Sequence, residues 1–221
     1  RAAVRRQYVA DDEQLVCSVG RLVYEKGAHL LIAALAQVHA QLPATKLVIA
    51  GTGPMSDELR RQAEAAGVAD QVIFAGYISD EARNDLFAVA DVAVFPSLYE
   101  PFGIVALEAM SYVCPVVASA TGGLAEIVRP HETGILAEPG NPNSLAWGIV
   151  HTLQHPEWAA ARARNALHEL ETTYSWTRIA TRTLKTYHQT LMSWRQNVPQ
   201  QPAAAPGTLV PGKLTIAADW A

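Results

Sequence analysis

Residues 15–27 read LVCSVGRLVYEKG, an apolar run that ends in a basic loop containing two glycines. Leu15–Val19 is short and almost continuously apolar, which is typical of a strand buried on both faces. The segment that follows, Ala28–Ala40, has the apolar spacing of a helix. The stretch therefore predicts one strand–loop–helix unit, with its polar residues in the loop where the strand ends.

The same alternation continues along the chain. The predicted strands are Leu15–Val19, Lys46–Ala50, Val72–Ala75, Val92–Phe95, Val116–Ser119 and Gly134–Ala137. The predicted helices between them are Ala28–Ala40, Asp57–Ala66, Asp80–Ala90, Gly103–Tyr112 and Leu124–Val128, the third preceded by the capping residue Ser79. We therefore predict an α/β fold: a Rossmann-like parallel sheet with helices on both faces and functional loops at the carboxyl ends of the strands.

The remainder of the chain has no further strand pattern. Helical patterns cover Asn141–Gln154, Glu157–Thr172 and Ser175–Trp194, and we expect these helices to pack against the sheet or a neighbour. Beyond them, proline and small residues dominate, a composition that cannot form a core. The sequence thus predicts one domain over residues 1–194 and a flexible proline-rich tail over 195–221.

Charge and cysteine content exclude several classes of protein. The 17 basic and 21 acidic residues give a net charge of −4 without long runs of either sign, which argues against a nucleic-acid partner. No apolar run approaches the roughly 20 residues of a membrane span, and the start of the chain does not resemble a signal peptide. Cys17 and Cys114 each lie beside an apolar run, which favours buried thiols over a disulfide. We expect a soluble, cytoplasmic protein.

The first loop carries two cations and two glycines where a helix begins. Backbone N–H groups and positive charge together bind phosphates. Arg21 offers a planar guanidinium with several N–H donors, and Lys26 offers the compact charge of an ammonium group. The spacing is neither the P-loop nor the dinucleotide fingerprint, which argues against an ATPase or a dehydrogenase. The loop indicates an anion site; the alternative is a solvated arginine and lysine.

A second loop, within residues 95–110, carries two carboxylates eight residues apart. Glu100 precedes the predicted helix and Glu108 lies about one turn inside it, so both can face one crevice. The backbone at Phe102–Val105 offers free N–H groups, and carboxylates accept hydrogen bonds from paired hydroxyls such as those of ribose or a sugar ring. The alternative is a surface glutamate and one that complements the helix dipole.

Two further features carry less weight. Thr121–Gly123 can open a helix as a phosphate-binding nest or can be plain loop structure. His151 and His155 have the spacing of a helical zinc site, but no acidic residue lies between them, and the chain contains no Asp-x-Asp sequence. We therefore predict no metal site.

Six sequence elements in a fixed order resemble the C-terminal, donor-binding half of the retaining family 4 (group 1) glycosyltransferases, which have the two-domain GT-B fold. The resemblance runs from Gly20 to about Tyr187. The elements are Gly-Arg-x4-Lys-Gly at 20–27, Ala-Gly-x-Gly-Pro at 50–54, Phe-x-Gly-Tyr at 74–77, Glu-x7-Glu at 100–108, Pro-Val-Val-Ala-Ser at 115–119 and Gly-Gly-x-x-Glu at 122–126.

The resemblance implies a role for each matching residue. Arg21 and Lys26 would neutralise the donor diphosphate and, with Glu100, form the catalytic group, while Glu108 would hold the ribose hydroxyls. Glu100 and the backbone of Phe102, Gly103 and Ile104 would lie around the donor sugar. The other donor-binding residues implied are Gly20, Gly51 and Gly53 near the donor and Tyr77 and Ile78 in the base pocket. For the glycines, the alternative of tight turns alone stays open.

The same resemblance implies a transferase of glycan or polysaccharide biosynthesis. It would move a sugar, with retention, from a UDP-, GDP- or ADP-sugar to a carbohydrate or lipid acceptor, without a cofactor or essential metal. The acceptor-binding N-terminal domain is absent from this chain, so we expect the fragment alone to be inactive; the whole enzyme could contact a membrane peripherally. The alternatives are a GT-B-like phosphorylase or nucleotide-sugar epimerase, or a non-catalytic nucleotide-sugar-binding module.

Overall fold

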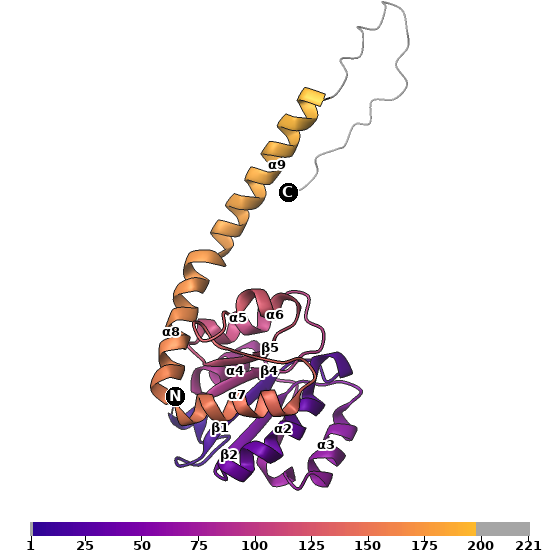
Figure 1. Cartoon of the computed structure of the whole chain (residues 1–221), viewed down its shortest axis with the longest axis vertical. Helices are drawn as coiled ribbons and strands as arrows, with labels where there is room; N and C mark the ends of the chain where they lie inside the picture. Colours follow the sequence, from indigo (N-terminus) through magenta and orange to yellow (C-terminus); the bar gives the residue numbers. More distant parts are fainter. Residues whose placement is uncertain (1, 198–221) are drawn as a thin grey trace, which may run out of the picture. The chain divides into compact units, whose positions relative to one another are not determined.

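A single parallel sheet organises the computed structural model, which describes residues 2–197 (Figure 1). Its six strands lie in the order β3-β2-β1-β4-β5-β6. Their bounds are β1 Gln14–Val19, β2 Thr45–Ala50, β3 Val72–Gly76, β4 Val92–Phe95, β5 Val116–Ser119 and β6 Ile135–Ala137. The strand pairs are all parallel, so the predicted α/β Rossmann-like fold is confirmed.

Helices connect the strands in alternation, close to the predicted ranges. The α-helices are α1 Ala2–Arg5, α2 Ala28–Gln41, α3 Ser56–Ala65, α4 Asp80–Val89, α5 Ile104–Ser111, α6 Gly122–Ile127, α7 Pro142–Gln154, α8 Pro156–Thr173 and α9 Trp176–Asn197. Two short 3-10 helices, η1 Tyr24–Lys26 and η2 Ala69–Gln71, complete the described elements. The Ser79 hydroxyl caps α4 by accepting a hydrogen bond from the Ala82 N–H at 3.2 Å, as its position predicts.

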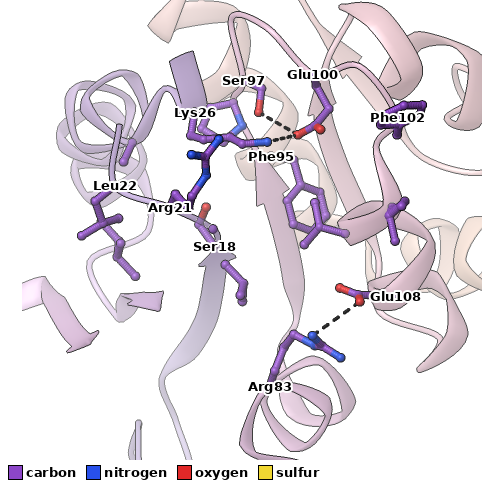
Figure 2. A pocket seen from close by; sticks show the side chains of 17 residues that line it. Ser18, Arg21, Leu22, Lys26, Arg83, Phe95, Ser97, Glu100, Phe102 and Glu108 are labelled. Atoms are coloured by element: carbon purple, nitrogen blue, oxygen red, sulfur yellow. Dashed lines mark hydrogen bonds and ion pairs between the residues drawn. The ribbon is translucent and has the colours of Figure 1, made fainter. Parts of the chain in front are cut away.

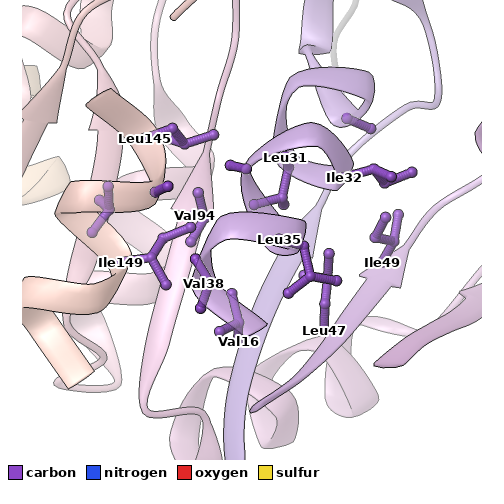
Figure 3. Close-up of a cluster of buried hydrophobic side chains, with 14 of the residues drawn as sticks. Val16, Leu31, Ile32, Leu35, Val38, Leu47, Ile49, Val94, Leu145 and Ile149 are labelled. Atoms are coloured by element: carbon purple, nitrogen blue, oxygen red, sulfur yellow. The ribbon is translucent and has the colours of Figure 1, made fainter. Parts of the chain in front are cut away.

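Each strand contributes apolar side chains to both faces of the sheet. In β1, Val16 points into a buried cluster beneath α2, α3 and α7, whereas Leu15 and Cys17 point into a second cluster beneath α4, α5, α6 and α8. Figure 3 shows the first cluster, in which Leu35 and Ile149 meet the strands. Two buried faces explain why the strand sequences are apolar throughout instead of alternating. Both cysteines are buried and free, as predicted.

The direction of winding reverses beside the first strand. The chain runs outward from β1 through β2 to β3, then returns to place β4 on the other side of β1 and continues through β5 to β6. In register, Val16 and Cys17 of β1 pair with Val92 and Ala93 of β4. The loops after β1 and β4 therefore diverge from neighbouring strands to opposite faces and leave a crevice between them.

The last helices divide between two compact units, Arg1–Ser175 and Trp176–Ala221. Helices α7 and α8 contribute to the two buried clusters, as expected. Helix α9 begins one residue after the predicted start and continues three residues beyond the predicted end at Trp194, and its side chains from Trp176 to Gln196 are exposed. This boundary precedes residue 194, the predicted end of the domain, and most of the predicted tail, 198–221, lies outside the described residues.

A row of aromatic rings lines the corner between α7 and α8. The Trp147 and His151 rings stack with centroids 5.1 Å apart, and the His155 and Trp158 rings stack at 4.8 Å. The two histidine rings between them are 4.4 Å apart, and His155 Nδ1 lies 2.9 Å from the carbonyl oxygen of His151. The i, i+4 histidine spacing noted in the sequence therefore serves ring packing at a helix corner.

Two histidines resist protonation in the folded chain. Burial lowers the pKa of His29, partly opposed by the negative charge of Glu58. Burial also lowers the pKa of His151, and nearby positive groups add to that effect. Those groups are His155, Arg162 and His131. The unfolded chain consequently binds more protons than the folded chain as the pH falls below the ordinary histidine pKa of about 6.5.

We predict that the free energy of unfolding decreases when the pH is lowered from about 7.5 to about 5.5, because protonation of these histidines favours the unfolded state. The test is urea denaturation at several pH values. His151→Gln should reduce the pH dependence, whereas the matched change of the exposed His188 should leave it intact. An unfolding free energy that is flat over this pH range would contradict the prediction.

Candidate functional site

A cavity of about 330 Å³ opens at the carboxyl ends of β1 and β4, where the winding reverses. The loop after β1, the loop after β4 and the start of α5 form most of its wall (Figure 2). Five charged side chains line it: Arg21, Lys26, Arg83, Glu100 and Glu108. Three cations against two carboxylates give the cavity a net positive charge, although the whole chain carries −4.

The first loop is fixed by backbone contacts, and one of its two cations has no partner among residues 2–197. The Leu22 N–H donates to the Thr52 carbonyl at 2.9 Å, and the Leu22 carbonyl accepts from the Met55 N–H at 3.1 Å. Gly27, at φ 71°, ends η1 and begins α2, with its Cα against the carbonyl of Pro96. Arg21 is exposed, and within the described part of the chain no hydrogen bond or ion pair engages its guanidinium.

The second loop is held from both sides. On one side the Leu98 N–H donates to the Glu25 carbonyl at 2.8 Å. On the other side the Gly123 N–H donates to the Glu100 carbonyl at 2.8 Å. A side chain at position 123 would collide with the backbone of Phe102, so this approach requires glycine. Thr121–Gly123 therefore anchors the Glu100 loop, which agrees with the structural alternative for that segment.

An ion pair joins the two loops inside the cavity. Lys26 Nζ lies 2.5 Å from Glu100 Oε2, and the side chains are 25% and 9% exposed. The Ser97 hydroxyl donates to the same carboxylate oxygen at 3.5 Å. A carboxylate this deeply buried is costly without a cation, so Lys26 compensates the charge of Glu100 and holds the side chain in place.

Glu108 lies at the other end of the cavity, on α5. Gly103, at φ 71°, precedes the helix, so the polypeptide turns sharply from the Glu100 loop into Ile104. Glu108 Oε1 lies 3.4 Å from Arg83 Nη1 of α4, and Figure 2 shows the two side chains facing each other. Phe102 and Ile104 are 75% and 58% exposed at the mouth of the cavity.

Seven of the twelve predicted site residues line this one cavity. They are Gly20, Arg21, Lys26, Glu100, Phe102, Ile104 and Glu108. Gly51, Gly53, Tyr77, Ile78 and Gly103 do not line it. Gly51 and Gly53 instead lie so close to the backbone of the first loop that a Cβ would collide with Gly20 or Leu22, which supports their alternative role as tight turns. Tyr77 is 81% exposed after β3.

Sequence reasoning missed Arg83. It belongs to the polar first turns of α4, among Asp80, Glu81, Asn84 and Asp85, where a charged side chain is ordinarily solvated. Its side chain is only 23% exposed. The one sequence signal was a cation on the helix that follows β3, and the sequence alone does not place that helix opposite Glu108.

A doubly wound α/β sheet with a positively charged cavity at its strand-order reversal is typical of proteins that bind a ligand at this point. The chain belongs to the glycosyl transferases group 1 family, whose sequence profile matches residues 1–169. It is 43% identical over 179 residues to an uncharacterized glycosyltransferase of Methanocaldococcus jannaschii, covering 81% of this chain and 46% of the relative. It is 40% identical over 200 residues to glycogen synthase of Mycobacterium tuberculosis, covering 90% of this chain and 48% of the relative.

Solved structures of the GT-B type share the fold. Sucrose-phosphate synthase of Thermosynechococcus elongatus superposes with a TM-score of 0.76 and 36% identity, covering 87% of this chain and 49% of that one. HepE of Anabaena, crystallised with UDP and glucose, gives 0.74 and 30% identity, covering 80% and 49%. The C-terminal domain of a Francisella tularensis group 1 glycosyl transferase gives 0.67 and 26% identity, covering 78% of this chain and 98% of that domain.

These matches identify which half of the fold is present. The chain spans about half the length of the curated relatives it matches, and it matches nearly the whole of an isolated C-terminal domain. The predicted resemblance to the C-terminal half of a GT-B glycosyltransferase is confirmed. Among the helices within residues 2–197, none combines the length and the apolar character that crossing a membrane requires.

We predict that Lys26→Ala lowers the free energy of unfolding by about 1–3 kcal/mol, because it leaves the buried Glu100 carboxylate without its cation. The further change Glu100→Gln should restore much of this loss, since the buried negative charge is then removed as well. Urea denaturation of the wild type, both single variants and the double variant measures the coupling. Additive effects of the two substitutions would show that the ion pair does not hold the loop.

Proposed function

We propose that this chain is the donor-binding half of a retaining glycosyltransferase that takes a sugar from a nucleotide diphosphate sugar. One observation carries the proposal: Arg21, Lys26, Glu100 and Glu108, which come from two separate loops, line a single cavity at the carboxyl edge of the sheet. The family match and the UDP named with the Anabaena structure support a nucleotide-sugar donor.

The two cations of the first loop would act on the diphosphate. As the bond between the anomeric carbon and the diphosphate oxygen breaks, negative charge grows on the leaving nucleotide. Arg21 has its donors unengaged within the described residues, and Lys26 lies beside it in the same cavity. Fixed positive charge placed where negative charge develops lowers the barrier, and here it would do so without a metal ion or cofactor.

The two carboxylates would divide the rest of the donor between them. Glu100, with the backbone around Phe102, would surround the transferred sugar, and Glu108 would accept hydrogen bonds from the ribose hydroxyls. We place the base towards Tyr77 and Ile78, beyond the end of β3. The N-terminal half of the intact enzyme would bind the acceptor, a carbohydrate or a lipid. This chain alone would therefore bind the donor without turning it over.

We predict that the chain binds at least one of UDP, GDP and ADP in calorimetric titration, with unchanged affinity in the presence of EDTA, because its own cations meet the diphosphate charge. No binding of any of the three at millimolar concentration would contradict the proposal. In the full-length protein, release of inorganic phosphate, or donor consumption without an acceptor, would instead favour a phosphorylase or an epimerase. Donor binding without any reaction would favour a non-catalytic module.

We predict that Arg21→Ala weakens binding of that nucleotide about tenfold or more, the effect of losing charged hydrogen bonds, while the melting temperature stays unchanged. Arg21 is the cleaner choice of the two cations, since its side chain is exposed and Lys26 also supports Glu100. Arg61→Ala, at an exposed position on α3 outside the cavity, is the matched control and should bind normally. Equal affinities for the two variants would remove Arg21 from the site.

A further inference from the structure

Arg83 lines the cavity, and none of the sequence elements that indicated the site includes it. Its guanidinium lies between two carboxylates: Nη1 is 3.0 Å from Asp80 Oδ1 and 3.4 Å from Glu108 Oε1. Nη2 donates to the Asn84 side-chain oxygen at 3.4 Å. The side chain is thus held by its own helix, α4, and reaches across to α5.

Glu108 depends on this one contact. Within the described residues, Arg83 is the only cation within 4.0 Å of the Glu108 carboxylate, and no other side chain donates a hydrogen bond to it. The Glu108 side chain is 33% exposed, so without Arg83 it could turn between several rotamers. The pairing engages Oε1, whereas no residue within 2–197 hydrogen-bonds to Oε2 or forms an ion pair with it.

The pairing also compensates the negative charge of Glu108, which would otherwise repel an anionic ligand. Each carboxylate in the cavity has its own cation, Lys26 for Glu100 and Arg83 for Glu108. A diphosphate would otherwise meet two uncompensated negative charges. The buried Nε atom of Arg83 has no hydrogen-bond partner in the described part of the chain, which leaves the guanidinium with a donor to spare.

We propose that Arg83 is a positioning residue for donor binding: it orients the Glu108 carboxylate towards the ribose hydroxyls and compensates its charge. This inference rests on the proposed function and adds a residue to it. Its particular consequence is that the contribution of Arg83 to affinity is larger when the ribose hydroxyls are present, beyond the charge effect that any diphosphate would feel. A residue that merely stabilises α4, or one that contacts phosphate or base, would contribute equally whether or not those hydroxyls are present.

The experiment is a thermodynamic cycle that combines a substitution in the protein with removal of the ribose hydroxyls from the ligand. Whichever of UDP, GDP and ADP binds the wild type is titrated alongside its 2′,3′-dideoxy form. We expect Arg83→Met to weaken binding of the nucleotide about tenfold, the typical effect of a charge-assisted contact, and to weaken binding of the dideoxy form distinctly less. Glu108→Gln should show the same pattern, and Arg83→Lys should recover part of the affinity.

The control is Arg129→Met, which removes an arginine paired with Glu132 and Glu169 outside the cavity and should bind both ligands as the wild type does. Full affinity of Arg83→Met for the nucleotide would overturn the proposal. An equal loss for the nucleotide and its dideoxy form would also overturn it, because Arg83 would then act independently of the ribose. A wild type that binds none of the three nucleotides would refute the proposed function itself and this inference with it.

Discussion

The site depends on one buried charge. Glu100 lies on a loop between β4 and α5, yet its side chain is 9% exposed and must have a cation. Lys26, from a loop 74 residues earlier, is that cation. Because the Leu98 N–H also donates to the Glu25 carbonyl, the ion pair and the backbone contact reinforce each other. The two loops are thereby joined into one wall of the cavity.

The sheet makes this contact geometrically available. Winding outward from β1 in both directions places the ends of β1 and β4 next to each other, with their loops leaving to opposite faces. Glycine at positions 27 and 123 lets the backbones of neighbouring loops approach more closely than any side chain would permit. The strand order therefore creates the crevice, and a few small residues bring its walls close together.

The strands and helices could be predicted from local sequence patterns, whereas contacts between loops far apart in the sequence could not. Doubly buried strands such as Val92–Phe95 are apolar throughout, so they stand out from the helices beside them, and their alternation with helices predicts a parallel sheet. Contacts between distant loops have no such periodic signal. Gly51 and Gly53 are equally consistent with ligand contacts or with turns, and only their close approach to Gly20 and Leu22 in the structure favours the turns. Arg83 was missed because its neighbours make α4 look like an ordinary solvated helix face.

The apolar residues that stabilise the fold lie apart from the charged residues of the cavity. The two apolar clusters lie on the faces of the sheet, within Arg1–Ser175, whereas the charged residues of the cavity lie at its edge. Exposed Arg21 can therefore change without disturbing the core, while Lys26 cannot, because it also compensates a buried carboxylate. Substitutions at the cavity should accordingly disturb the fold least at Arg21, Phe102 and Ile104, whose side chains are exposed there without supporting its walls.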